Sequence, residues 1–315
     1  MPEFIRRPLE GLFPLVPLSL DGDQEIDLAA IGHNIGMLGE AGVSGMIVFG
    51  SMGQMTNVSE AEFDRVAEFA VDEGHRHGLA VVVGSTAAYE REAIRRARVA
   101  ERAGADGSML AAPYALPLTP DQAMGFFRSV ASSLDGDMAL MLYNYSPLNG
   151  LNVTPAMWEQ LFDEPNIKAI KESNLALPHF DQVMLTIGDR INVFTGNDPG
   201  FFHGSMMGAV GTTGIFCWGA LRSANRFVDE CRKGNHADPW VRSAFEALQG
   251  LSATIREPTM PSMLTFEHGY LNAIVEAAGG KTGGPRRPYG VLPEEAVARV
   301  RTAMGRLQEL ETAGA

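Results

Sequence analysis

The chain has 315 residues, of which 45% are hydrophobic and 20% charged, a composition typical of a globular protein with one large domain or two ordinary ones. The formal net charge of -13 argues against a basic binding face, so we expect no nucleic-acid partner. No apolar run is long enough to span a bilayer, so we expect no membrane partner either.

The N-terminus and the cysteines bear on whether the protein is exported or stays in the cytoplasm. Arg6-Arg7 could begin a twin-arginine export signal, but prolines and an acidic residue interrupt the next ten residues, and no small-residue cleavage site is present. The two cysteines, Cys217 and Cys231, form no disulfide framework pattern. A reducing compartment is the simplest setting, and we therefore expect a cytoplasmic protein.

Taken in chain order, extended apolar runs alternate with amphipathic helical runs. Strands are predicted at 12–20, 46–50, 80–84, 108–112, 138–145, 167–171, 192–195 and 210–216. Helices are predicted at 27–40, 60–72, 90–103 and 220–231, with two more beginning at 119 and 154. Ser59 and Glu62 form a capping-box pattern, and Pro120 suits a first helical position. Strands that alternate with helices pair in parallel, and eight such units over about 225 residues predict a (β/α)8 TIM barrel.

Three further helical patterns come after the barrel, at 239–255, 262–278 and 293–311, with no strand among them. We therefore predict a barrel over residues 1–234 and a C-terminal helical region over 235–315. No low-complexity linker separates the two.

The most informative residue is Lys171, an amine at the end of the apolar strand 167–171. Desolvation favours a neutral amine, which can attack a carbonyl and form a Schiff base. Tyr143 ends the preceding strand, and catalytic groups of TIM barrels lie at these strand ends. Lys168, three residues earlier, should face the opposite side. The alternative interpretation is that Lys171 is an ordinary surface lysine.

A glycine-bracketed turn, Gly50-Ser51-Met52-Gly53, comes directly after the second strand. Such a turn can direct successive backbone N–H groups at an anion such as a carboxylate. The alternative is a tight turn with no ligand.

These residues occur in an order that resembles the dihydrodipicolinate synthase / N-acetylneuraminate lyase superfamily of class I Schiff-base aldolases, over nearly the whole chain. The matching segments are Gly50-Ser51-Met52-Gly53-Gln54, Ala103-Gly104-Ala105-Asp106-Gly107, Pro113-Tyr114, Tyr143-Asn144, Ile170-Lys171-Glu172-Ser173, Gly196-Asn197-Asp198, Gly208-Ala209-Val210-Gly211 and Arg286-Arg287-Pro288. No single segment is decisive, but their order and spacing are specific.

The resemblance implies roles for particular residues. Lys171 would form an imine with a pyruvate-like 2-oxo acid, Tyr143 would relay protons, and Ser51 would hydrogen-bond Tyr143. The backbone of Ser51 and Met52 would hold the substrate carboxylate. Further substrate-binding residues are expected at Gly50, Leu148, Gly196 and Thr213. The resemblance also implies a homotetramer built as a dimer of dimers, small-molecule 2-oxo acid and aldehyde substrates, no cofactor and no metal.

Several positions depart from the pattern of dihydrodipicolinate synthases. Leu148 stands where an arginine usually binds the aldehyde carboxylate, and Ala115 where a second tyrosine reaches across a subunit interface. Met52 and Gln54 replace a threonine and a glutamate. The apolar segment 212–218 also predicts a less polar second substrate. We therefore expect a lyase that is not a genuine dihydrodipicolinate synthase.

Three other interpretations remain open. A hydratase-aldolase acting on an aryl or apolar 2-oxo acid would fit the segments 105–110 and 284–289. A barrel that binds a 2-oxo acid without catalysis would fit the replacements just named. His75 and His77 could be a metal pair, although a solvated turn at a helix end is the favoured interpretation.

Overall fold

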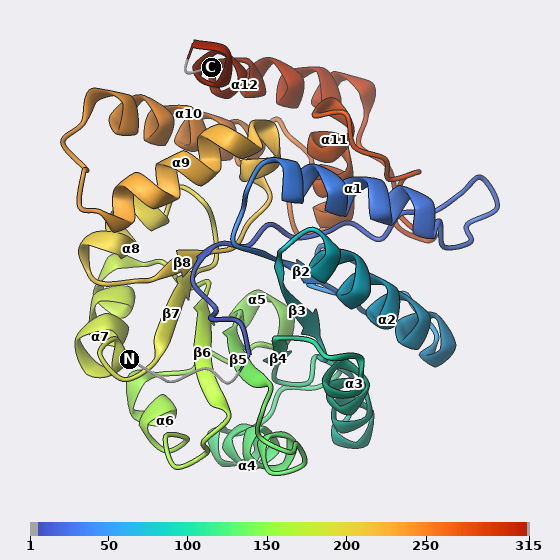
Figure 1. Ribbon diagram of the computed structural model, residues 1–315, viewed down its shortest axis with the longest axis vertical. Helices are drawn as coiled ribbons and strands as arrows, with labels where there is room; N and C mark the ends of the chain where they lie inside the picture. Colours follow the sequence, from blue (N-terminus) through green and yellow to red (C-terminus); the bar gives the residue numbers. More distant parts are fainter. Residues whose placement is uncertain (1–5, 314–315) are drawn as a thin grey trace.

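The computed structural model describes residues 6–313, and its centre is a barrel of eight parallel strands (Figure 1). The strands are β1 (Gly11–Leu12), β2 (Gly45–Val48), β3 (Ala80–Gly84), β4 (Gly107–Ala111), β5 (Ala139–Asn144), β6 (Ile167–Glu172), β7 (Asn192–Thr195) and β8 (Gly211–Thr212). The ladder runs in the order β1-β8-β7-β6-β5-β4-β3-β2. A parallel bridge between Leu15 and Ile47 joins its two ends and closes the barrel. The predicted TIM barrel is confirmed.

Helices surround the barrel, and most of them begin where local sequence signals place them. They are α1 (Leu28–Glu40), α2 (Glu60–Arg76), α3 (Glu90–Ala103), α4 (Pro120–Ala131), α5 (Ser146–Asn149), α6 (Pro155–Glu159), α7 (Leu177–Ile187), α8 (Phe201–Met206) and α9 (Leu221–Arg232). Ser59 and Glu62 form the expected capping box of α2, and Thr119 forms another with Gln122 at α4. These caps satisfy backbone N–H groups that have no partner inside the helix.

The barrel interior is packed with side chains, and two glycines make room for them. The rings of Phe13 and Phe194 meet edge to face, with their centroids 5.3 Å apart. A Cβ atom on Gly45 would lie 2.4 Å from the Phe13 ring, and one on Gly211 would lie 2.5 Å from the Phe194 ring. Glycine at these two strand positions therefore lets the aromatic core fill the barrel.

The first and last strands are shorter than predicted. Beyond Leu12 the chain continues as an extended segment, in which Phe13 donates a hydrogen bond to Thr212 and Val16 donates one to Ile47. The predicted eighth strand ends at Thr212 and is followed by the 3-10 helix η1 (Phe216–Gly219). The side chain of Asp198 accepts the Phe216 N–H at 2.9 Å, and this contact holds the chain in the turn that leads into η1.

The C-terminal helices are α10 (Pro239–Ile255), α11 (Glu267–Ala277) and α12 (Glu294–Ala313). Helix α10 packs against α9 and α12, and α11 packs against η1 and α12. They lie together at one side of the barrel (Figure 1). None of the helices in residues 6–313 combines the length and hydropathy that a membrane span requires.

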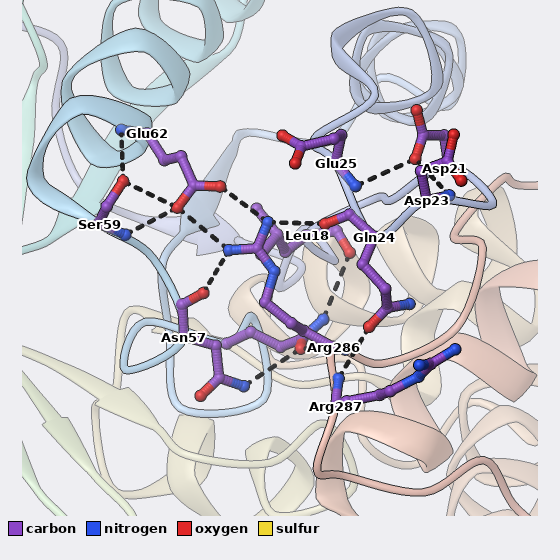
Figure 2. A network of polar contacts seen from close by, with 11 residues as sticks. Leu18, Asp21, Asp23, Gln24, Glu25, Asn57, Ser59, Glu62, Arg286 and Arg287 are labelled. Atoms are coloured by element: carbon purple, nitrogen blue, oxygen red, sulfur yellow. Dashed lines mark hydrogen bonds and ion pairs between the residues drawn. The ribbon is translucent and has the colours of Figure 1, made fainter.

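The segment after α11 is attached to the loop between β2 and α2 by a polar network around Arg286 (Figure 2). The Arg286 guanidinium donates to both carboxylate oxygens of Glu62 and to the backbone oxygens of Asn57 and Gln24. Its backbone N–H donates to Gln54 Oε1 at 2.8 Å. This network connects the C-terminal helical region to the turn that begins at Gly50.

Candidate active site

A cavity of about 130 Å³ opens where β5 and β6 end. Its lining residues are Leu15, Ser51, Met52, Tyr143, Tyr145, Lys171, Ser173, Gly196, Asn197, Gly214, Ile215, Phe216, Arg256, Met263 and Glu267. A larger hollow of about 260 Å³ lies beside α1, α9 and α12, but it contains neither Lys171 nor Tyr143. The cavity at the strand ends is therefore the candidate active site.

Lys171 is almost fully buried, with 2% of its surface exposed. It is the register partner of Tyr143 on the neighbouring strand, and its Nζ atom lies 4.2 Å from the centre of the Tyr143 ring. Burial lowers the pKa of Lys171 to about 7, and the negative charges of Glu267 and Asp198 oppose this shift. A large share of the amine is therefore neutral near pH 7. Lys168 is only half-buried, as expected for a side chain that faces the other way.

Tyr143 is a buried phenol whose surroundings favour the protonated form. Burial raises its pKa well above the usual value, the charge of Tyr145 adds to this, and the hydroxyls of Ser51 and Ser173 act in the opposite direction. The Tyr145 ring stacks on Tyr143 with centroids 5.5 Å apart and planes at 4°. The pKa of Tyr145 is itself raised to about 12, chiefly by burial. The raised pKa keeps the Tyr143 phenol protonated near neutral pH.

The turn after β2 presents backbone donors to the cavity. Gln54 closes the turn by donating its N–H to the Ser51 carbonyl at 3.1 Å, and it does so with a φ of 61°. The N–H groups of Ser51 and Met52 meet no protein acceptor within residues 6–313. Two free neighbouring N–H groups beside an amine form a suitable site for a carboxylate.

A second polar cluster lies behind the two strand ends and fixes their positions. The Asn144 side-chain amide donates to both oxygens of Glu172, at 3.0 and 2.9 Å. Glu172 also accepts the Asn174 N–H at 2.7 Å and lies 3.3 Å from Nε2 of His179. Because Asn144 is adjacent to Tyr143 and Glu172 to Lys171, this cluster holds both site residues in register.

Ser173 and Gly196 meet closely at the cavity wall. A Cβ atom on Gly196 would lie 1.8 Å from Ser173 Oγ, so only glycine fits there. The Ser173 hydroxyl is buried, and no hydrogen-bond partner is found for it in the part of the chain that the structure describes. It lies close enough to Tyr143 to lower the pKa of that phenol, and it lines the same cavity.

The C-terminal region supplies an acidic wall. Glu267, the first residue of α11, faces the cavity, and burial raises its pKa to about 7 while the charge of Lys171 lowers it. The next residue, His268, is buried, and its Nδ1 lies 3.3 Å from the Met52 carbonyl oxygen. This contact joins the start of α11 to the turn after β2. An amine and a carboxyl with pKa values near 7 thus face one cavity from opposite parts of the chain.

Five of the predicted site residues line the cavity: Lys171, Tyr143, Ser51, Met52 and Gly196. The other three, which were expected to bind substrate, are Gly50, Leu148 and Thr213, and they do not line it. A Cβ atom on Gly50 would meet Leu15, Leu148 packs partly buried on the hydrophobic core, and Thr213 is fully buried. The chemical roles assigned to the five cavity residues stay predictions.

Other lining residues were missed from the sequence. Tyr145 and Ser173 each lie two positions after a predicted residue, so strand alternation could have indicated them. Arg256, Met263 and Glu267 come from the C-terminal region and carry no local sequence signal for this location.

The two histidines considered as a metal pair bind different partners. Nε2 of His75 lies 2.9 Å from Asp106, and Nε2 of His77 lies 3.2 Å from Glu73 in the preceding turn of α2. The two rings thus make separate side-chain hydrogen bonds at the end of α2. Within residues 6–313, no group of three or more His, Cys, Asp or Glu side chains is arranged to hold a metal ion.

Comparison with known proteins gives relatives along nearly the whole chain. It is 27% identical over 271 residues to YagE of Escherichia coli (strain K12), a proposed 2-dehydro-3-deoxy-D-gluconate aldolase, covering 85% of each chain. It is also 27% identical over 305 residues to the 4-hydroxy-tetrahydrodipicolinate synthase of Methanothrix thermoacetophila, covering 95% of this chain and 97% of the relative.

Solved structures share the fold. The crystal structure of YagE in complex with pyruvate superimposes with a TM-score of 0.85 at 24% identity, covering 96% of this chain and 99% of that one. CdNal from Clostridium difficile, solved in complex with mannosamine, gives a TM-score of 0.83 at 17% identity, covering 95% and 99%. The sequence pattern of the Dihydrodipicolinate synthetase family matches residues 8–305. The chain therefore belongs to the dihydrodipicolinate synthetase family, whose members are lyases and aldolases.

Proposed function

We propose that this protein is a Schiff-base aldolase or lyase that joins, or separates, a pyruvate-like 2-oxo acid and an aldehyde through an imine on Lys171. The observation that carries the proposal is a buried amine with a pKa of about 7, next to a buried phenol in a cavity at the strand ends. Membership of a family of lyases and aldolases supports it.

The proposed mechanism begins with binding of the 2-oxo acid. Its carboxylate takes the free N–H groups of Ser51 and Met52, which brings its ketone to Lys171. The neutral amine attacks the ketone carbon, and Tyr143 passes protons between the nitrogen and the departing oxygen. The protonated imine then withdraws electrons, so a proton leaves the adjacent carbon and an enamine forms. The enamine carbon attacks the aldehyde, and water finally releases the product from Lys171.

The second substrate is proposed to be an aldehyde with an apolar body. Ile215, Phe216 and Met263 give the cavity an apolar wall that suits such a substrate. Arg256 is exposed at the cavity and is the residue that could accept a carboxylate on a longer substrate. The apolar walls also favour a second candidate, a hydratase-aldolase that acts on an aryl-substituted 2-oxo acid.

The proposed assembly is a homotetramer built as a dimer of dimers, with each active site complete within one chain, because Ala115 stands where a tyrosine would reach across a subunit interface. Light scattering at micromolar concentration tests it, and a monomer would contradict it. We also propose a cytoplasmic location, which the buried free thiols of Cys217 and Cys231 support.

The test of the function is reduction with borohydride in the presence of pyruvate, followed by peptide mass spectrometry. We expect a pyruvate adduct on the peptide that contains Lys171, and its loss in Lys171→Arg. Lys168→Arg is the matched control and should keep the adduct. If pyruvate binds but no 2-oxo acid is trapped, the protein is a non-catalytic binding barrel and the proposal is wrong.

A further inference from the structure

We propose that Glu267 is a catalytic residue that donates a proton to the aldehyde oxygen during condensation and removes it again during cleavage. The inference rests on the proposed function and assigns a group to a step that Lys171 and Tyr143 leave open. Those two residues act on the 2-oxo acid, whereas the new bond also creates an alkoxide on the second substrate.

The position of Glu267 fits the second substrate. Lys171 and Tyr143 are 2% and 4% exposed, at the buried end of the cavity, whereas Glu267 keeps a larger exposed fraction. The 2-oxo acid occupies the buried end, so an aldehyde that arrives afterwards lies between the enamine and Glu267. Because Glu267 lines this cavity, its carboxyl group can reach the oxygen of an aldehyde bound there.

The carboxyl group is free to act. No side-chain hydrogen bond to Glu267 and no ion pair within 4.0 Å is found among residues 6–313. The Lys171 amine is thus close enough to influence Glu267 electrostatically but does not form an ion pair with it. An accessible, unpaired carboxyl beside a reacting amine is what a proton donor requires.

The backbone position of Glu267 is fixed by its neighbour His268. The His268 contact with the Met52 carbonyl oxygen holds the start of α11 against the turn that binds the 2-oxo acid. The edge of the His268 ring packs on Tyr289, with centroids 4.7 Å apart. A displacement of about 1 Å can greatly slow a proton transfer. The His268 contacts therefore help to keep Glu267 at the distance that the transfer requires.

The step balances without any added reagent. The enamine carbon supplies an electron pair to the aldehyde carbon, and the carbonyl oxygen takes the proton of Glu267. The nitrogen lone pair forms the C=N bond of the protonated imine. In cleavage the Glu267 carboxylate takes the hydroxyl proton, the C–C bond breaks and its electron pair returns to the enamine.

The electrostatic surroundings place the proton exchange near neutral pH. The pKa of Glu267 is about 7, raised by burial and lowered by Lys171. The groups that face it are Lys171 on β6, Tyr143 on β5, Tyr145 just after β5, Arg256 after α10, and His268 on its own helix. Lys171 and Glu267 titrate as a coupled pair, so one proton can be shared between them near pH 7.

The test uses Glu267→Gln in the full chain, with Glu295→Gln on the exposed surface of α12 as the matched control. Two readouts separate the steps. Borohydride trapping and deuterium exchange into the methyl group of pyruvate report the imine and enamine. Turnover with a panel of aldehydes, including glyceraldehyde and benzaldehyde, reports bond formation. We expect Glu267→Gln to keep trapping and exchange within about threefold, and to lose about 10²–10⁴-fold in turnover.

The pH dependence provides an independent readout. In the unmutated protein, condensation should fall as pH rises through about 7, because Glu267 loses its proton. In Glu267→Gln the condensation rate should no longer fall as pH rises through about 7. Glu267→Asp should restore part of the rate, and its rate should again fall at alkaline pH. Removing the carboxylate should also move the acid limb of imine formation to lower pH, since Glu267 raises the pKa of Lys171.

The outcomes separate this inference from the proposed function. No trapping in the unmutated protein overturns the proposed function. Trapping together with unchanged turnover in Glu267→Gln overturns only the role of Glu267. Trapping without turnover of any aldehyde in the panel also overturns it, because the assigned step then does not occur. Equal losses of exchange and turnover would show that Glu267 supports Lys171 instead of the aldehyde.

Discussion

Glu62 and Arg286 lie 224 positions apart in the sequence, yet their side chains form two hydrogen bonds, at 2.8 and 3.1 Å (Figure 2). The planar guanidinium matches the carboxylate with two donors, which strengthens the pair. Arg286 lowers the pKa of Glu62 to about 2. Both side chains are about one-fifth exposed, so the pair is partly shielded from solvent. It joins the segment before α12 to the first turn of α2.

Stability should therefore depend on this pair. We expect Glu62→Gln to lower the free energy of unfolding at pH 7 by about 1.5–3 kcal/mol, the usual contribution of hydrogen bonds between charged groups. Glu62 has a lowered folded-state pKa, so its contribution is present above about pH 4.5 and is lost as pH falls toward 2. Urea unfolding of the two proteins at pH 7 and at pH 3 measures the loss of stability and its dependence on pH. Glu68→Gln, exposed on the same helix, is the control; equal effects of the two variants would contradict the prediction.

Imine formation should follow the ionisation of a lysine with a pKa of about 7. The rate of adduct formation with pyruvate and cyanoborohydride should rise with pH through 7 and then level off. An ordinary lysine, with a pKa near 10.5, would give a rate that still increases above pH 9. Rates measured between pH 5.5 and 9.5 decide between the two behaviours.

Tyr143→Phe keeps the stacked ring and removes the hydroxyl. We expect turnover and deuterium exchange into pyruvate to fall by about 10²–10⁴-fold, with a smaller change in pyruvate affinity. Tyr89→Phe, which changes a half-exposed phenol outside the cavity, should leave both unchanged. Full turnover in Tyr143→Phe would exclude the relay.

Substrate preference should follow Arg256 and the apolar wall. Leu148 does not line the cavity, so Arg256 is the cation available to a carboxylate on the aldehyde. We expect poor use of aspartate semialdehyde and better use of uncharged aldehydes. Arg256→Leu should further lower kcat/KM for acidic aldehydes. For uncharged aldehydes, kcat/KM of this variant should stay within about threefold of the value for the unmutated protein. Efficient use of aspartate semialdehyde by the unmutated protein would contradict this prediction.

The sequence was sufficient to predict the barrel and the proximity of Lys171 and Tyr143. Apolar runs of strand length alternate with capped helices, and a lysine and a tyrosine end adjacent strands; both patterns are local and can be read directly. Helices α7 and α8 were not predicted, and neither carries a side-chain cap at its first residue.

The rest of the site depends on contacts between distant parts of the chain. Glu267 reaches the cavity because α11 packs against η1 and His268 meets Met52. Leu148 was expected in the site because it stands where the family pattern has an arginine; in the structure it lies in the short helix α5 and packs against the core. Such positions depend on tertiary packing, which no periodicity along the sequence reports.

The cavity is built from two separate parts of the chain, and this has a consequence for how the protein could diversify. Lys171, Tyr143 and Ser51 come from the barrel, whereas Arg256, Met263 and Glu267 come from the C-terminal helical region. Substitutions around the ends of α10 and α11 can therefore alter one wall of the cavity without disturbing the strands that hold the lysine. Gene duplicates could acquire new aldehyde partners through changes confined to one short stretch of the gene, and directed evolution could begin at the same three codons.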